Sequence, residues 1–316
     1  MRNFADRLTD KIAEFNNPTV MGLDPKLDYI PEFIKDEAAA KFPEDAEKAT
    51  AEALFQFNKA LIDATYDIIP AIKPQHAYYE MYGIEALKAL NATIKYAQDK
   101  GMIVISDAKR NDIGPSAAAY SEGIIGKTEI LGGDVTSMTG SDCVTVNGYL
   151  GIDGIKPFLD VCERDGKGIF VLVRTSNPSA GDLQDLVLED GRKVYEAMAS
   201  LVNEWGSSLT GENGFSSVGA VVGATWPEQA VEIRKIMKNN LILVPGYGAQ
   251  GAGPDAAVAS FTADGKGSIV NASRSLMTAW KKRDDLVPEE FATATRDEAF
   301  DMKEKLNNAL KDRKYV

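Results

Sequence analysis

Histidine and cysteine are scarce in the sequence, which has one histidine, His76, and two cysteines, Cys143 and Cys162, among 316 residues. A single histidine excludes a metal site built from several histidines, and any Ser/His/Asp mechanism that does not use that residue. The cysteines cannot form a disulfide framework and lie in no CxxC or Cys/His pattern. We expect a reducing, cytoplasmic compartment, with His76 and both cysteines packed in the interior. The chemistry then depends on Lys, Asp, Arg or an external cofactor.

Long hydrophobic runs and basic clusters are also absent. No stretch of about 18 consecutive apolar residues occurs, and the N-terminal segment MRNFADRLTDKIAEFNN lacks the apolar core of an export signal. The 47 acidic and 35 basic residues give a net charge of −12, and no basic run is present to attract a nucleic-acid backbone or an anionic lipid surface. We therefore expect no visible export signal, no membrane partner and no nucleic-acid partner.

Short β-branched, apolar runs alternate with longer segments of helical periodicity, such as 85–98 and 226–237. Eight runs predict strands: Thr19–Leu23, Ile68–Ile72, Met102–Ser106, Cys143–Val146, Gly168–Val173, Val218–Val222, Leu241–Val244 and Ser268–Val270. Eight strands with intervening helices match an α/β fold of the (β/α)8, or TIM barrel, class. Length alone leaves one or two domains open, and the barrel favours a single domain over residues 1–316.

Three segments exceed what a minimal barrel needs. Residues 28–51 form an acidic insertion after the first strand, residues 182–193 form a charged stretch after the fifth, and residues 281–316 form a charged helical tail. Solvated charged faces are common in proteins, so we expect surface elaborations. A partner-binding role for these segments stays open.

The active site of such a barrel lies at the C-terminal ends of its strands, so the residues that follow each strand are the candidates for function. Polar and charged residues follow most of the predicted strands. They lie in the segments Gly22–Pro25, Lys73–Gln75, Asp107–Asp112, Arg174–Pro178, Pro245–Gly248 and Asn271–Arg274. We expect these side chains to converge on one mouth of the barrel.

The end of the third strand is the most informative of these segments. Asp107 and Lys109 are two residues apart and therefore point to the same side of the strand. Lys73, at the end of the neighbouring strand, should lie beside Asp107, while Asp112 follows in the loop. A line of Lys73, Asp107, Lys109 and Asp112 sums to zero charge, so all four groups can stay ionised when partly buried. The alternative is a salt-bridge network that only braces the barrel rim.

The loops after the seventh and eighth strands predict a phosphate site. The segment from Gly246 through Gly248 to Gly251 formally satisfies GxGxxG, but it follows the seventh strand of eight rather than the first strand of a Rossmann domain. Barrels commonly bind phosphate at this position through glycine-exposed backbone N–H groups. Arg274 is then a candidate phosphate clamp and Gln250 a further hydrogen-bond donor. The alternative is that the glycines only form a tight turn.

The chain resembles the orotidine 5'-phosphate decarboxylase family, in particular its longer form, through nearly its whole length. The shared motifs are FADRL, GLDP, KPQHAYYE, SDAKRNDIG, TVNGYLGIDGI, VRTSNPSAGDLQD, GATWPE, VPGYGAQGAG and NASRSLM. The DxKxxD pattern alone also occurs in related phosphate-binding barrels, but its combination with KPQ, TSNPSAG and PGxGAQG is highly specific. The resemblance implies conversion of orotidine 5'-monophosphate to uridine 5'-monophosphate and CO2, the last step of de novo pyrimidine biosynthesis.

The resemblance also implies roles for the charged residues. Lys109 matches the lysine that delivers a proton to C6 of the pyrimidine, and Asp107 matches the aspartate that lies against the substrate carboxylate. Asp112 matches an aspartate that reaches the site of the neighbouring subunit, which implies a homodimer with shared active sites. Lys73 and Asp24 match residues near the ribose hydroxyls.

Further matches concern substrate binding. Ser116 falls where a hydroxyl residue of the partner subunit lies near the ribose, and Ser176 matches the serine that reads the pyrimidine edge. Gln250 and Arg274 match the phosphate ligands. Arg174 has no clear counterpart and is left unassigned.

The chemistry agrees with this interpretation. Loss of CO2 leaves a carbanion at C6 without an electron sink, and the sequence shows no cofactor motif. We therefore expect preorganised charged side chains to stabilise the carbanion, with neither a cofactor nor a metal. One rival is a metal-dependent decarboxylase of a sugar-phosphate keto acid, which also carries a DxKxxD strand end. A rival of another class is a non-catalytic phosphosugar-binding or nucleotide-binding protein on the same barrel.

Overall fold

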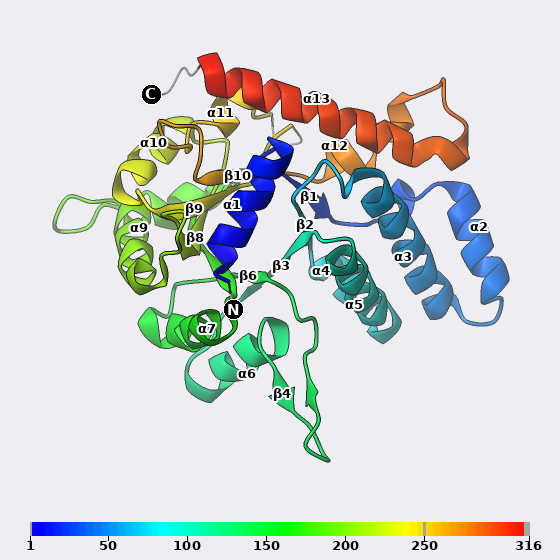
Figure 1. Ribbon diagram of the computed structural model, residues 1–316, viewed down its shortest axis with the longest axis horizontal. Helices are drawn as coiled ribbons and strands as arrows, with labels where there is room; N and C mark the ends of the chain where they lie inside the picture. The colour runs from blue at the N-terminus through cyan, green and yellow to red at the C-terminus, as the bar shows by residue number, and fades with distance from the viewer. Residues whose placement is uncertain (1, 249–250, 313–316) are drawn as a thin grey trace.

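A closed barrel of eight parallel strands forms the centre of the molecule (Figure 1). The structure is a computed structural model that describes residues 2–248 and 251–312. The barrel strands are β1 (Thr19–Leu23), β2 (Ala71–Pro74), β3 (Ile103–Arg110), β6 (Cys143–Val146), β7 (Gly168–Arg174), β8 (Ser216–Val222), β9 (Asn240–Val244) and β10 (Ser268–Ala272). Each strand pairs with its neighbours in the chain, and β1 closes the ring against β10. The predicted fold class is confirmed.

The helices cover the outside of the barrel (Figure 1). They are α1 (Phe4–Phe15), α2 (Glu32–Lys41), α3 (Ala46–Thr65), α4 (Ala77–Glu80), α5 (Ile84–Asp99), α6 (Gly114–Ile124), α7 (Ile152–Asp165), α8 (Gly181–Gln184), α9 (Val194–Trp205), α10 (Pro227–Ile236), α11 (Pro254–Ala257), α12 (Arg274–Met277) and α13 (Phe291–Asp312). The helices predicted over 85–98 and 226–237 are α5 and α10, each within one residue at both ends. Within the described ranges, no helix is both long and apolar enough to cross a bilayer.

Most predicted strands match the observed ones closely, but β3 ends four residues later than predicted and β2 begins three residues later. The prediction begins this strand at Ile68, whereas the strand begins at Ala71. The backbone N–H groups of Ile68 and Ile69 both donate to the carbonyl of Thr65, at 3.0 and 2.9 Å, and so complete the C-terminal turn of α3. These two apolar residues are buried in that turn rather than paired in the sheet.

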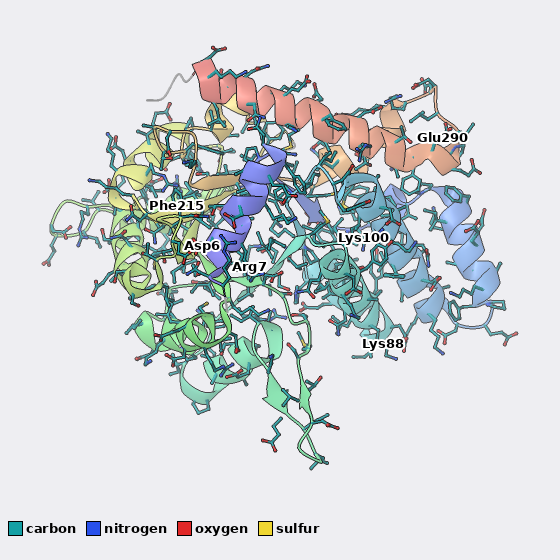
Figure 2. The ribbon with its side chains drawn as sticks, in the orientation of Figure 1. Asp6, Arg7, Lys88, Lys100, Phe215 and Glu290 are labelled. Carbon is teal, nitrogen blue, oxygen red and sulfur yellow. The ribbon has the colours of Figure 1, made fainter. Side chains whose placement is uncertain are left out.

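Helix α1 closes the end of the barrel opposite the C-terminal ends of the strands. Phe4 packs edge-on against Phe170 inside the barrel, with ring centroids 6.1 Å apart. A Cβ atom at Gly168 would lie 2.1 Å from the Phe4 ring, so glycine is required for this close approach. Asp6 and Arg7 project from the same helix (Figure 2). Asp6 accepts the backbone N–H groups of the turn before β8, and Arg7 pairs with Asp142 at 2.7 Å.

As far as residue 312, where the described part of the chain ends, the C-terminal tail is not a surface elaboration, which corrects the prediction for residues 281–316. Apolar residues at helical spacing along α13 are buried in the main core, among them Phe291, Met302 and Leu306. The Phe291 ring stacks on Phe57 of α3 with centroids 5.6 Å apart. The charged residues of the tail lie on the opposite face of an amphipathic helix whose apolar face completes the core.

The other two elaborations also contact the interior of the protein. In the acidic insertion, Ile34 and Ala38 of α2 join the main core. In the charged stretch 182–193, Asp185 forms an ion pair with the fully buried Arg174 at 3.1 Å. A protrusion that the sequence did not predict is the antiparallel hairpin of β4 (Thr128–Glu129) and β5 (Val135–Thr136), which extends from the barrel below α6 (Figure 1).

The buried face of α13 leads to a stability prediction. Leu306→Ala removes a fully buried side chain and should lower the free energy of unfolding by about 2–5 kcal/mol in urea titrations. Leu201→Ala in α9 is the matched control, because that leucine is 40% exposed and its loss should cost less than about 0.5 kcal/mol. Equal, small effects of both substitutions would contradict the assignment of α13 to the core.

Candidate active site

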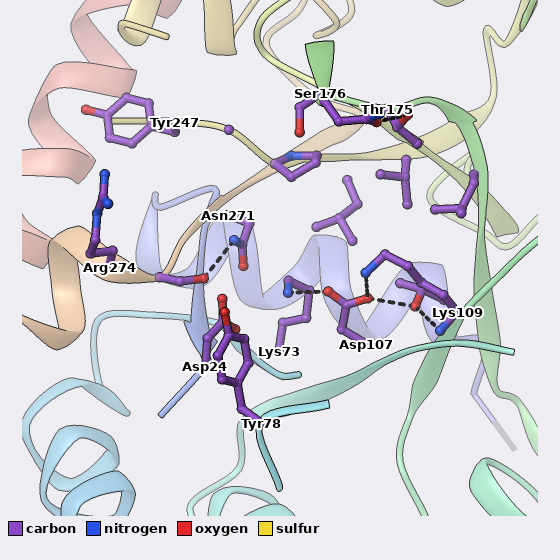
Figure 3. A pocket seen from close by; sticks show the side chains of 18 of the residues that line it. Asp24, Lys73, Tyr78, Asp107, Lys109, Thr175, Ser176, Tyr247, Asn271 and Arg274 are labelled. Carbon is purple, nitrogen blue, oxygen red and sulfur yellow. Dashed lines mark hydrogen bonds and ion pairs between the residues drawn. The ribbon is translucent and has the colours of Figure 1, made fainter. Parts of the chain in front are cut away.

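A cavity of about 650 Å³ opens at the C-terminal ends of the barrel strands (Figure 3). Its lining combines charged, hydroxyl and amide side chains with a few apolar ones. The residues that line it include Asp24, Lys73, Tyr78, Asp107, Lys109, Thr145, Thr175, Ser176, Asn177, Gly246, Tyr247, Asn271, Ser273 and Arg274. Each of the six predicted strand-end segments contributes to this lining, although Arg174 does not.

The Asp107 carboxylate is the centre of the charged part of this cavity. Its Oδ1 accepts hydrogen bonds from Lys109 Nζ at 2.6 Å and from Thr145 Oγ1 at 2.9 Å. Its Oδ2 accepts from Lys73 Nζ at 2.6 Å and from Gln75 Nε2 at 3.1 Å. Four donors thus fix the carboxylate on both sides, and the predicted contacts of Asp107 with the two lysines are confirmed.

The two lysines differ in their access to the cavity. The Lys73 side chain is only 5% exposed, whereas that of Lys109 is 45% exposed. Burial opposes ionisation of the Asp107 carboxyl, but Lys73 and Lys109 outweigh it and hold the pKa of Asp107 well below its usual range. Burial likewise opposes the charge of Lys73, and the nearby Asp107 and Asp24 outweigh it and raise the pKa of that ammonium. Lys73 and Asp107 are therefore a buried ion pair, and Lys109 is the member that can reach a ligand.

The backbone at the end of β3 is shaped to place Lys109. Lys109 has φ +48°, a conformation that non-glycine residues adopt at a cost of about 1–3 kcal/mol. The backbone N–H groups of Ala108 and Lys109 both donate to Thr145 Oγ1, at 3.1 and 3.0 Å. The pairing of β3 with β6 shifts register over the same residues. Thr145 therefore holds both the carboxylate and the strained backbone that carries the lysine.

Two predicted residues, Asp112 and Ser116, do not line the cavity of the described chain. Asp112 Oδ1 accepts the N–H of Ile113 at 2.8 Å, and Ser116 is exposed on α6. Within one chain the line therefore has three members, and the fourth, Asp112, is the residue that the resemblance assigns to the site of a neighbouring subunit. The reason is geometric, because the loop after β3 turns outward to begin α6.

Arg274 lines the other end of the cavity, at the first residue of α12 (Figure 3). Gly246 and Tyr247 lie at the same end, and Gly246 has φ +97°, which requires glycine. Gly248 lines an adjoining hollow that it shares with Arg274 and Tyr247. Gln250 lies outside the described residues. The predicted phosphate loop and clamp are therefore together at one end of the site.

Two buried acceptors lie between these charged ends. Asp24 Oδ1 and Asn271 Oδ1 are inaccessible to solvent and have no hydrogen-bond partner within the described chain. Both residues line the cavity, and Figure 3 shows them between Arg274 and Lys73. Unpartnered buried acceptors are uncommon in proteins, and both belong to residues that form the wall between the two charged ends of the cavity.

Sequence reasoning gave no role to Thr145, and it named Gln75 and Asn271 only as members of the strand-end segments. Thr145 shares the inward face of β6 with the buried Cys143, and this alternation could have indicated it. Gln75 donates to Asp107, and the amide oxygen of Asn271, a residue only 7% exposed, has no partner in the described chain. Nothing in the sequence signals either of these two features.

The remaining predicted residues are accounted for by packing. His76 is buried and its Nε2 lies 3.0 Å from Ser106 Oγ, and burial lowers the pKa of its imidazole to about 4. Cys143 and Cys162 are buried free thiols. No group of three or more His, Cys, Asp or Glu side chains in the part of the chain that the structure describes is arranged to hold a metal ion.

Comparisons with known proteins agree on one family. A family model described as Orotidine 5'-phosphate decarboxylase / HUMPS family matches residues 45–286. The chain is 42% identical over 294 residues to the orotidine 5'-phosphate decarboxylase of Rhodopirellula baltica, covering 93% of this chain and 92% of that protein. It is 38% identical over 314 residues to the enzyme of Caldicellulosiruptor saccharolyticus, covering 98% and 100%.

A solved structure gives the same result. The structure of Leishmania donovani OMP decarboxylase superposes with a TM-score of 0.73 at 28% identity, covering 98% of this chain and 99% of that one. The fold, the cavity and the sequence relatives are thus consistent with one another. The chain therefore belongs to the orotidine 5'-phosphate decarboxylase family, the carboxy-lyases that convert orotidine 5'-monophosphate to uridine 5'-monophosphate and CO2 in pyrimidine biosynthesis.

Proposed function

We propose that Lys109 is the proton donor of this decarboxylation. The observation that carries the proposal is the Lys73–Asp107–Lys109 ion chain, in which Lys109 alone is half exposed toward the cavity. When the bond between C6 and the carboxylate breaks, CO2 leaves and the electron pair stays on C6. The Lys109 ammonium then gives its proton to C6 and becomes a neutral amine, which regains a proton from solvent after product release.

Asp107 contributes to the same step through its fixed negative charge. A substrate carboxylate placed beside Lys109 also lies near the Asp107 carboxylate, so the two anions repel each other in the bound substrate. The repulsion is relieved as CO2 departs, while Lys109 continues to stabilise the charge that moves to C6. Because Lys73, Gln75 and Thr145 hold Asp107 in place, the carboxylate cannot turn away from the substrate.

The rest of the cavity fits the remaining parts of the nucleotide. We assign the 5'-phosphate to Arg274 and Gln250 at the loop after β9, where Gly246 and Gly248 leave room for an anion beside Arg274. Asp24, which lines the cavity, offers its carboxylate to a ribose hydroxyl, with Lys73 beside it. Ser176, on the opposite wall in Figure 3, is assigned to the pyrimidine edge.

We also propose that the active unit is a homodimer. Asp112 and Ser116 lie outside the cavity of their own chain, at the start of an α6 helix whose first turn is exposed. In a symmetric dimer the same segment of each chain can enter the partner's site, and Asp112 would then complete the alternating line next to Lys109. Residues 1–316 form one catalytic domain in this proposal, and it acts in the cytoplasm.

The proton-donor role predicts a large loss of turnover in Lys109→Ala. We expect kcat to fall by about 10³-fold or more, since general acid catalysis and charge stabilisation are lost together. The assay follows the decrease in ultraviolet absorbance as orotidine 5'-monophosphate is consumed. Lys95→Ala, a change of an exposed lysine on α5, is the matched control and should keep wild-type turnover. Near-normal decarboxylation by Lys109→Ala would rule out the proposed role.

The phosphate assignment predicts a different pattern for Arg274→Ala. Loss of a charged clamp should raise KM for orotidine 5'-monophosphate by about 100-fold, with a much smaller change in kcat. Orotidine, which has no phosphate, is the internal control. Its kcat/KM should be the same in the variant and the wild type, and an equal loss with both substrates would place the phosphate elsewhere.

The dimer proposal predicts complementation between two inactive variants. Asp112→Asn and Lys109→Ala should each be inactive alone, yet in a heterodimer one site contains both native residues. Unfolding and refolding an equal mixture should therefore restore roughly a quarter of the wild-type activity, as random pairing requires. No gain over the separate variants, or sedimentation as a monomer in the presence of product, would contradict a shared site.

A further inference from the structure

Arg174 is the last residue of β7, and its side chain is fully buried although it does not line the active-site cavity. By strict alternation it would point into the barrel, as Phe170 and Leu172 do. The pairing of β7 with β8 shifts register between Leu172 and Arg174, and this bulge directs Arg174 outward. Its guanidinium is therefore enclosed between the barrel and the outer helices.

Each nitrogen of the buried guanidinium has a hydrogen-bond or ion-pair partner, and an aromatic ring covers one of its faces. Its Nε donates to Gln229 Oε1, its Nη1 donates to Gln184 Oε1 at 3.1 Å, and its Nη2 pairs with Asp185 at 3.1 Å. The Trp226 ring covers its face, with the guanidinium carbon 4.3 Å from the ring centroid. A buried charge is tolerated only with such partners, so the positions of Gln184 and Asp185 are tied to Arg174.

Gln184 connects this buried cation to the wall of the active site. The same Oε1 that accepts from Arg174 also accepts the backbone N–H of Thr175 at 3.0 Å, and Nε2 donates to Thr175 Oγ1 at 2.8 Å. Thr175 Oγ1 donates in turn to Asn177 Oδ1 at 2.6 Å. A chain of hydrogen bonds thus runs from Arg174 through Gln184 into residues 175–177, which line the cavity.

The segment 175–177 is also supported from behind. Trp226 Nε1 donates to the Thr175 carbonyl at 3.0 Å, and Thr225 Oγ1 donates to the Ser176 carbonyl at 3.3 Å. A Cβ atom at Gly223 would lie 2.7 Å from Ser176 Cβ, so glycine lets the two backbones meet. The Trp226 side chain contributes twice, because it both covers Arg174 and holds Thr175.

We propose that Arg174, acting through Gln184, is a positioning residue that sets the segment 175–177 against the pyrimidine ring of the substrate. The inference rests on the proposed function, in which this wall of the cavity faces the pyrimidine. Arg174 suits the task because its planar fork bonds Gln184 and Asp185 together while its face lies on Trp226, an arrangement that a lysine ammonium cannot reproduce.

Gln184→Met tests the proposal most cleanly, because it removes both bonds to Thr175 but leaves the Arg174–Asp185 pair in place. We expect the Kd for uridine 5'-monophosphate to rise by about tenfold in calorimetric titration, as loss of the two bonds requires. The Kd for ribose 5-phosphate, which has no pyrimidine, should stay within about twofold of the wild type because its own contacts are intact. Arg174→Lys should show the same selectivity.

Gln98→Met is the matched control, since this half-buried glutamine also bonds a loop carbonyl, that of Gly140, but lies away from the cavity. It should bind both ligands like the wild type. If Gln184→Met weakens both ligands equally, or neither, the positioning role is overturned. Ser176→Ala is measured in parallel. If this variant binds uridine 5'-monophosphate like the wild type, the proposed contact of Ser176 with the pyrimidine is wrong. The positioning role of Arg174 is still decided by the Gln184→Met result.

Discussion

The active site depends on one buried carboxylate, that of Asp107, which is held between two lysines. An ion inside a protein is stable only when its partners repay the loss of water, and removal of one partner of a buried pair costs about 3–5 kcal/mol. Asp107 has four donors, two of them charged, and stays ionised although it is buried. Thr145 Oγ1 hydrogen-bonds both this carboxylate and the strained backbone at Lys109, so the barrel fixes the lysine before any ligand binds.

The net charge of the whole molecule is negative, whereas cationic side chains stand at both ends of its active-site cavity. The chain has a net charge of −12, which argues against polyanionic partners. Its cavity nevertheless places Arg274 at one end and Lys73 with Lys109 at the other, with Asp107 between the two lysines. This arrangement suits a small anionic nucleotide whose phosphate and carboxylate lie at opposite ends. Phosphate binding far from the reacting carbon then supplies energy that offsets the repulsion at Asp107.

Much of the fold and of the charged line could be predicted from the sequence, because both follow from local periodicity. The two-residue spacing of Asp107 and Lys109 correctly predicts that they meet, although the strand is irregular at Lys109, and the order of strands brings Lys73 next to Asp107. What could not be predicted depends on exceptions to periodicity or on tertiary contacts. The bulge that turns Arg174 outward breaks the alternation, and the helical turn at Thr65 takes up the N–H groups of Ile68 and Ile69. The burial of α13 was hidden by its many charged residues, although its apolar spacing indicated an inward face.

The central claim is that Lys109, fixed by Asp107, faces the carbon that loses CO2. A crystal structure of the protein with bound uridine 5'-monophosphate tests it most directly, since the product retains C6, the ribose and the phosphate. We expect Lys109 Nζ at about 3 Å from C6, within the range of a direct polar contact, with Asp107 still bonded to both lysines and the phosphate on Arg274. A complex with Lys109 turned away from C6, or with the nucleotide reversed in the cavity, would contradict it.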